Sequence, residues 1–278
     1  MSRFTTFGLT ILLAFAPAAL AVDGIVLINQ STITNGLTGC PTGGHFPIII
    51  CQSGSYRLSG NLIMPDVNTT AIQINADNVT FDLNGFSILG PVVCSGLPVT
   101  SCSPNGSGIG INSTNSYITI SNGTVRGFGT LGIFLVGGVS LTGALAGAGL
   151  RIEGVTVSNN AEGGIVSGGE GSIFNLCHAI ANGNSGITGH GTLTNSSALF
   201  NSIDGITWGG SATGNSSRAN GGSGFSGQGV FTANEAADNK SFGISVSQPS
   251  VITSNQIFRN GGTISFVSGS VISNNVAQ

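Results

Sequence analysis

The chain has 278 residues, of which 46 are glycine, 40% are hydrophobic and 6% are charged, and its formal net charge is -3. Disordered chains combine low hydrophobicity with high net charge, and collagen needs glycine at every third position, so this composition favours a folded, non-collagenous protein. Seven Lys and Arg against ten Asp and Glu form no basic stripe, which argues against nucleic acid as a partner.

The first 21 residues have the pattern of a secretory signal peptide. Arg3 supplies the basic start, an apolar stretch runs from Phe7 to Leu20, and small residues end it at Ala21. An uncleaved anchor is the competing interpretation, but the stretch is shorter than the roughly 20 apolar residues that span a bilayer, and it contains Pro17. We therefore expect export to the periplasm, the cell surface or the medium, with no membrane contact after cleavage.

Residues 22 to 70 are predicted to form an N-terminal cap and the first strands, and residues 71 to 278 a repetitive body. Five cysteines suit an oxidising compartment. The short spacings Cys40 to Cys51 and Cys94 to Cys102 predict two local disulfides, the second within a Pro/Ser/Gly-rich loop at residues 91 to 107. Cys177, among apolar neighbours, is expected to be a buried thiol. A small-residue insertion is expected from Gly137 to Gly149.

A repeat dominates the C-terminal half. Asparagine is followed four residues later by glycine and then by an apolar residue at five places, 22, 19, 19 and 19 residues apart, and a copy one residue shorter begins at Asn260. Such a fixed period is typical of a solenoid. The marked asparagines are Asn160, Asn182, Asn201, Asn220 and Asn239.

Apolar residues between these marks alternate with a period of two, as strands require, and they fall into three columns per repeat. The pattern predicts an all-β parallel β-helix with three sheets and about nine or ten coils, each asparagine bonding to the next and tolerating a left-handed backbone. The expected inward columns include Ile165, Ile187, Ile206 and Phe225; Phe174, Leu193, Ala212 and Phe231; and Val157, Ala179, Ala198 and Ala236.

Two blocks carry a resemblance to a known family. They are the repeats after Asn160 and the N-terminal segments Gly54-Ser55-Tyr56-Arg57-Leu58 and Asn78-Val79-Thr80-Phe81-Asp82-Leu83-Asn84-Gly85. In these the chain resembles secreted right-handed parallel β-helix repeat proteins of the pectate-lyase-like superfamily. The resemblance, with the usual hand of parallel crossovers, implies a right-handed helix, and it implies polysaccharide as the substrate class of any enzyme on this scaffold.

The residues that such enzymes need are sparse. Polygalacturonase-like hydrolases need clustered Asp, and this sequence has no Asp-Asp pair to partner His190 in Gly189-His190-Gly191. A lyase needs carboxylates for calcium and a basic residue, so calcium is expected under that alternative alone. The weak catalytic candidates are Asp204, Arg218, Glu235 and Asp238, for which a surface salt bridge between adjacent coils is the plainer interpretation.

Trp208 allows two orientations. The equivalent positions of flanking coils are Gly189 and Gly227, which leave room for an indole turned inward, while an outward indole would form a binding patch with His190 and Gln228. A flat Thr face for ice binding is disfavoured, because the candidate set of Thr192, Thr194, Thr213, Thr232 and Thr253 supplies at most one Thr per coil after Thr194. The leading hypothesis is an exported, non-catalytic scaffold that binds carbohydrate or a cell-surface polymer and self-associates at its C-terminal coil. The alternative is a lyase or glycoside hydrolase acting on an acidic polysaccharide.

Overall fold

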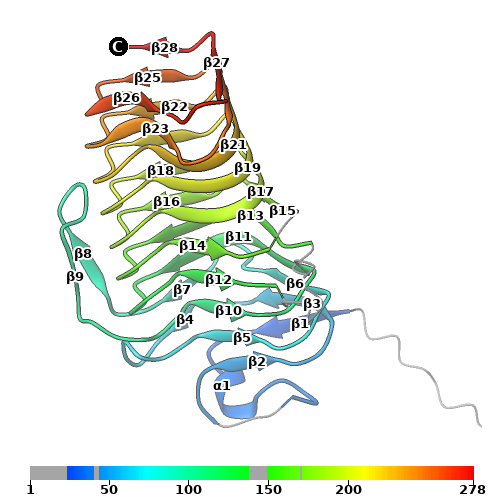
Figure 1. The fold of residues 1–278 in the computed structure, drawn as a ribbon. Coiled ribbons are helices and arrows are strands. Elements are labelled where there is room, and N and C mark those ends of the chain that lie inside the picture. The colour runs from blue at the N-terminus through cyan, green and yellow to red at the C-terminus, as the bar shows by residue number, and fades with distance from the viewer. Residues whose placement is uncertain (1–23, 41–43, 138–148, 170) are drawn as a thin grey trace, which may run out of the picture.

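The computed structural model describes residues 24–40, 44–137, 149–169 and 171–278. They form a parallel β-solenoid of about ten turns, with a single short helix, α1 (Thr32–Asn35), at the N-terminal end (Figure 1). The predicted signal peptide and most of the Gly137 to Gly149 insertion lie outside the described residues. Within the described residues, no helix has the length and apolar character needed to cross a membrane.

Each turn contributes to three parallel sheets, as predicted. The first sheet contains β2 (Ile48–Ile50), β5 (Ile72–Ile74), β10 (Ile111–Ser113), β12 (Ile133–Leu135), β14 (Ile165–Ser167), the first parts of β17 (Ile187–Thr194), β19 (Ile206–Thr213) and β21 (Phe225–Thr232), then β23 (Phe242–Val246) and β26 (Gly262–Ser265).

The second sheet continues after a bend. It contains β1 (Ile25–Ile28), β3 (Gly54–Leu58), β6 (Val79–Asp82), the first parts of β11 (Ile118–Arg126) and β13 (Arg151–Ser158), β15 (Ser172–Asn175), the last parts of β17, β19 and β21, then β24 (Val251–Thr253) and β27 (Val271–Ser273). The solenoid pairing therefore begins with β1, inside the segment expected to hold the cap and the first strands.

The third sheet completes each turn. It contains β4 (Leu62–Ile63), β7 (Ser87–Leu89), the last parts of β11 and β13, β16 (His178–Ile180), β18 (Ser197–Leu199), β20 (Ser216–Arg218), β22 (Glu235–Ala237), β25 (Gln256–Phe258) and β28 (Val276–Ala277). Parallel rungs of this kind lie about 4.8 Å apart.

The core is the stack of inward columns that the sequence predicts. Ile187, Ile206 and Phe225 pair in register on the first sheet, and Leu193, Ala212 and Phe231 pair on the second. All six side chains have no exposed surface. Because successive turns place apolar side chains at the same three positions, with the buried Ser217 as an exception in the third column, burial fixes the register of the otherwise glycine-rich strands.

The marked asparagines form one buried ladder along the corner between the third and first sheets. The side-chain Oδ1 of each accepts hydrogen bonds from the backbone N–H and Nδ2 of the preceding one, with Nδ2 to Oδ1 distances of 2.9 to 3.0 Å. Asn160, Asn182, Asn201, Asn220, Asn239 and Asn260 are the members. The predicted ladder is confirmed and extends through the short repeat at Asn260.

One expectation about this corner was wrong. The left-handed backbone belongs to the residue before each ladder asparagine, for example Ala181 (φ 54°), Phe200 (φ 59°) and Ala219 (φ 53°). That residue turns the chain so that the next side chain points inward, where its amide finds both partners. Because the turn and the hydrogen bonds fall on adjacent residues, the turning position accepts Ala and Phe.

A second ladder, which the sequence reasoning missed, follows the corner between the second and third sheets. Asn215, Asn234, Asn255 and Asn275 bond to one another in the same way, with Nδ2 to Oδ1 distances of 2.9 to 3.0 Å. Their spacing of 19, 21 and 20 residues is the visible signal. They escape the asparagine-to-glycine pattern because no glycine lies four positions after any of them.

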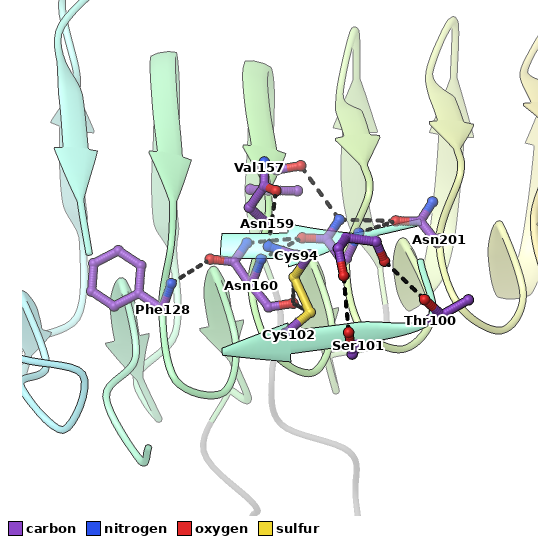
Figure 2. The surroundings of a disulfide bond; sticks show 11 residues. Cys94, Thr100, Ser101, Cys102, Phe128, Val157, Asn159, Asn160 and Asn201 are labelled. Carbon is purple, nitrogen blue, oxygen red and sulfur yellow. Dashed lines mark hydrogen bonds between the residues drawn. A yellow bond between two sulfur atoms is a disulfide. The ribbon is translucent and has the colours of Figure 1, made fainter. Parts of the chain in front are cut away.

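Both predicted disulfides, Cys40–Cys51 and Cys94–Cys102, are present, and Cys177 is a buried free thiol. The second disulfide joins β8 (Val93–Ser95) to β9 (Ser101–Ser103), an antiparallel hairpin that we call the arm. The arm lies along the outside of the first ladder (Figures 1 and 2). It is held there by hydrogen bonds from the Cys94 N–H to Asn159 Oδ1 and from the Val99 N–H to the Phe200 carbonyl.

Candidate functional site

Charged side chains converge on the third sheet near its C-terminal end. Arg218 on β20 lies 3.5 Å from Glu235 on β22 and 3.7 Å from Asp238, which follows β22. Arg259, which follows β25, lies 2.6 Å from Asp238. The structure thus brings together three of the four catalytic candidates and adds Arg259. The pairing of Arg218 with Asp238 across adjacent coils is the one that the sequence spacing indicated.

The two arginines differ in how firmly they are held. Arg259 donates two hydrogen bonds to Asp238, at 2.6 and 2.8 Å, and this pairing holds the pKa of the Asp238 carboxyl below its usual range. Arg218 makes the longer contacts to both carboxylates. Exposed ion pairs of this kind contribute about 0 to 1 kcal/mol to stability. Glu235 and Arg218 are therefore the members of the cluster most free to exchange partners.

Asp204 does not belong to this cluster. Its Oδ1 accepts the Ser223 N–H at 2.7 Å and its Oδ2 accepts the Ser226 hydroxyl at 2.8 Å, both from the following coil. It has no salt bridge in the described part of the chain. The expectation of a single edge formed by Asp204, Arg218, Glu235 and Asp238 is wrong, because Asp204 lies in the turn that leads into β19 and ties that turn to the next one.

Trp208 adopts the inward of its two predicted orientations. Its side chain is 1% exposed, its indole Nε1 donates to the Gly191 carbonyl at 3.1 Å, and its ring packs on Phe174 with centroids 5.3 Å apart. The indole leans over Gly189, where a Cβ would lie 2.6 Å from the ring. A displayed Trp208 platform is thus ruled out by packing, and this tryptophan forms part of the core.

His190 and Gln228 remain on the outside, two rungs apart on the strands that flank Gly209. Together with Thr188, Thr207 and the backbone at Gly189 and Gly227 they line an open depression of about 280 Å³, which we call the His190 groove. Gly209 matters here because a Cβ at this position would collide with the His190 imidazole. The imidazole therefore lies over the glycine backbone, and the groove has a flat floor.

Some polar groups of the His190 groove form hydrogen bonds to other residues, and others form none. The Thr207 and Ser226 hydroxyls lie 2.9 Å apart, in the chain of hydrogen bonds that ends on Asp204. Among the described residues, neither His190 nor Gln228 has a side-chain hydrogen bond, and His190 Nδ1 is buried without a partner. The lining residues include no carboxylate, so His190 has nothing there to orient it as a catalytic base.

The described residues contain no group of three or more His, Cys, Asp or Glu side chains arranged to hold a metal ion. A further ion pair, Arg151 with Glu153 at 2.7 Å, lies exposed on the second sheet, away from both the cluster and the groove. Arg57 with Asp82, at 3.1 Å, is another ion pair on the second sheet, and none of the described Asp, Glu, Lys or Arg side chains lines the His190 groove.

Comparison with known proteins supports the fold and leaves the activity open. No protein-family model matches the sequence, and no curated protein matches it either. Among solved structures, the chain is similar to the Dettilon tailspike protein (gp208), with a TM-score of 0.51 and 14% identity over 90% of this chain. The match spans 61% of the tailspike chain. At this identity the similarity establishes a shared β-helical architecture.

Proposed function

We propose that this protein is an exported, non-catalytic β-solenoid that binds a carbohydrate polymer, with the His190 groove as a binding site. The observation that carries the proposal is that His190 and Gln228, on the two sides of Gly209, form no side-chain hydrogen bond among the described residues.

The shape and chemistry of the groove favour an uncharged sugar. Its floor consists of the backbone at Gly189, Gly209 and Gly227, and its rim carries the Thr188 hydroxyl with the imidazole and the Gln228 amide. Binding sites commonly combine an apolar surface with a few well-placed polar groups. A pyranose ring, with its C–H face and its hydroxyl edge, matches that combination. The tailspike-like architecture is in keeping with a role connected with polysaccharide.

Export is proposed from the first 21 residues together with the disulfides. Cys40–Cys51 and Cys94–Cys102 persist in oxidising compartments and are rare in the cytosol. A neutral Ser, Thr and Asn surface then faces the medium. We expect the protein recovered from the culture medium or the periplasm to begin near Val22 and to lack the preceding residues. Its intact mass would show this.

Affinity electrophoresis provides the binding test. The protein is run through gels that contain dextran, galactomannan, xyloglucan or arabinoxylan, and through gels with alginate, pectate or hyaluronan. We expect retardation by a neutral polymer, and we expect His190→Ala and Gln228→Ala each to weaken it about tenfold. His178→Ala is the matched control, because His178 lies on the third sheet bonded to Ser197. Equal mobility in all gels would refute carbohydrate binding.

The enzymatic alternative, a lyase or glycoside hydrolase acting on an acidic polysaccharide, is favoured by one observation: Arg218 and Glu235 are loosely held and accessible. It is tested by incubating the protein with pectate, alginate or hyaluronan, with and without calcium, and following the formation of reducing or unsaturated ends. Product formation that Arg218→Ala or Glu235→Gln abolishes would support an enzyme. If no product forms, the enzymatic alternative is refuted, and carbohydrate binding remains the proposed function.

A further inference from the structure

A second depression lies at the corner between the second and third sheets. It has a volume of about 310 Å³ and crosses three consecutive coils. We call it the corner groove. Its floor follows the turns at Gly214, Ala233 and Ser254, and its wall carries Ser216, Glu235 and Gln256.

The corner groove exists because the turning residues of these coils are small. Gly214 (φ 69°), Ala233 (φ 53°) and Ser254 (φ 58°) occupy the left-handed position that precedes each member of the second ladder. Two and three coils before Ala233, the same position holds Asn195 and Leu176, and the Leu176 side chain is 46% exposed. A bulky residue fits this backbone conformation, so the groove depends on side-chain size and not on the fold.

Glu235 gives the corner groove its chemistry. Its Oε2 lies 3.4 Å from the Ser216 hydroxyl and its Oε1 lies 3.5 Å from Arg218, both long contacts for a carboxylate. Strong hydrogen bonds to a carboxylate are shorter than about 3 Å, as in the pairing of Asp238 with Arg259. Glu235 therefore has acceptor capacity left for hydroxyl donors, and its charge disfavours an anionic ligand beside it.

The two grooves share the same strands. Gly209 on β19 lines the His190 groove, and Gly214, directly after β19 and five residues farther along, lines the corner groove, which corresponds to about 16 Å of extended chain. The surface between them is the outer face of the second sheet, where Thr213, Thr232 and Thr253 pair in one column. A chain of sugars that leaves one groove meets hydroxyl groups before it reaches the other.

We propose that the corner groove is a second saccharide site, that Glu235 accepts hydroxyl groups of a neutral sugar there, and that a single polymer chain crosses the second sheet to occupy both grooves. This inference rests on the proposed function, because the His190 groove supplies the first contact. Linking two weak sites through one ligand raises the overall affinity by on the order of 100-fold without any new contact.

The test uses size-fractionated oligomers of whichever neutral polymer retards the full-length protein. We expect calorimetric affinity to rise steeply, by on the order of 100-fold, once an oligomer is long enough to reach both grooves. Ala233→Leu, which copies the residue found at Leu176, is expected to fill the corner groove and abolish the rise, while short oligomers still bind at the His190 groove with the affinity of that groove in the wild type. Glu235→Gln, a smaller change, is expected to reduce the rise.

The control is Ala219→Leu. Ala219 has the same left-handed conformation (φ 53°) at the other corner, where Phe200 shows that a large residue fits, and it lines neither groove. A smooth length dependence, or an Ala233→Leu protein that binds long oligomers like wild type, would overturn the second site and leave the proposed function intact. If His190→Ala had no effect while Ala233→Leu removed binding, the His190 groove would be refuted instead.

Discussion

The amide nitrogen of Asn201 fills the space in which Gly186, on the preceding coil, would carry a Cβ. An atom built there lies 2.6 Å from Asn201 Nδ2, and also 2.7 Å from the Gly205 carbonyl oxygen. Gly164 and Asn182 stand in the same relation, as do Gly224 and Asn239. The asparagine-to-glycine repeat is thus a contact between coils: each glycine accommodates the ladder asparagine of the next turn.

Replacing that glycine tests this relationship. We expect Gly186→Ala to lower the free energy of unfolding by about 1 to 3 kcal/mol, because the new methyl group overpacks against a buried amide whose position is fixed by hydrogen bonds. Gly60→Ala is the control, since its Cβ would meet Asn29 at an ordinary 3.9 Å. Urea unfolding followed by circular dichroism measures both. Equal stability of the two variants would contradict the contact.

The asparagine ladder makes a stronger prediction. Asn201→Ala removes the acceptor of the Asn182 N–H and Nδ2, and it also leaves the Ala179 carbonyl and Asn220 Oδ1 without the Nδ2 donor of Asn201. Each unsatisfied buried group costs about 1 to 3 kcal/mol, so we expect a loss of at least about 3 kcal/mol in the free energy of unfolding. Asn184→Ala, at an exposed position nearby, is expected to change it little.

The arm is expected to open locally when its disulfide is removed. Closing a loop as short as that between Cys94 and Cys102 stabilises the closed form by about 2 to 3 kcal/mol in the chain-entropy model. In the Cys94→Ser/Cys102→Ser protein, hydrogen exchange should quicken at the Val99 N–H, which donates to the Phe200 carbonyl, and at neighbouring arm amides. Exchange across β22 and β25 should stay as it was. Unchanged protection of the arm would show that its docking does not need the disulfide.

Cys177 is expected to stay unreactive until the protein unfolds. Burial raises the pKa of its thiol from 9.0 to about 12, so the thiolate is scarce at neutral pH. A pKa that is higher in the folded state contributes stability below pH 9, and this contribution is lost as the pH rises from 9 to 12. Labelling with a thiol reagent in native and denaturing buffer checks the reactivity. Cys177→Ala should flatten the alkaline loss of stability.

The last coil is expected to self-associate with a second copy. Val271 and Ile272 are 57% and 37% exposed there, while Ile252, the partner of Ile272 on the preceding coil, has no exposed surface because β27 covers it. Sedimentation equilibrium should show association that Val271→Lys weakens, with Val93→Lys on the arm as a control of similar exposure. A monomer at all concentrations would contradict this prediction.

Much of the architecture follows from the sequence alone. A fixed interval between Asn182, Asn201 and Asn220 predicts that the corners of successive coils are superposed. The period-two columns predict three inward faces, because the register that places apolar side chains above one another keeps them buried. The cysteine spacings also predict both disulfides, since two cysteines eight or eleven residues apart can meet when the chain between them reverses its direction once.

Tertiary structure decided what lies on the surface. The sequence placed Asp204 beside Arg218, but the turn before β19 directs its carboxylate to Ser223 and Ser226. The corner groove forms because the turning positions of three successive coils hold the small residues Gly214, Ala233 and Ser254. Its depth depends on the side chains of Ser216, Glu235 and Gln256 beside them.

The inward columns were thus determined by the sequence alone, because burial imposes one repeating rule on every coil. The outward side chains obey no such rule. Contacts between coils, such as that of Arg259 with Asp238 and that of the His190 imidazole with Gly209, set their positions. The three-dimensional fold therefore had to show which of them are free to bind a ligand.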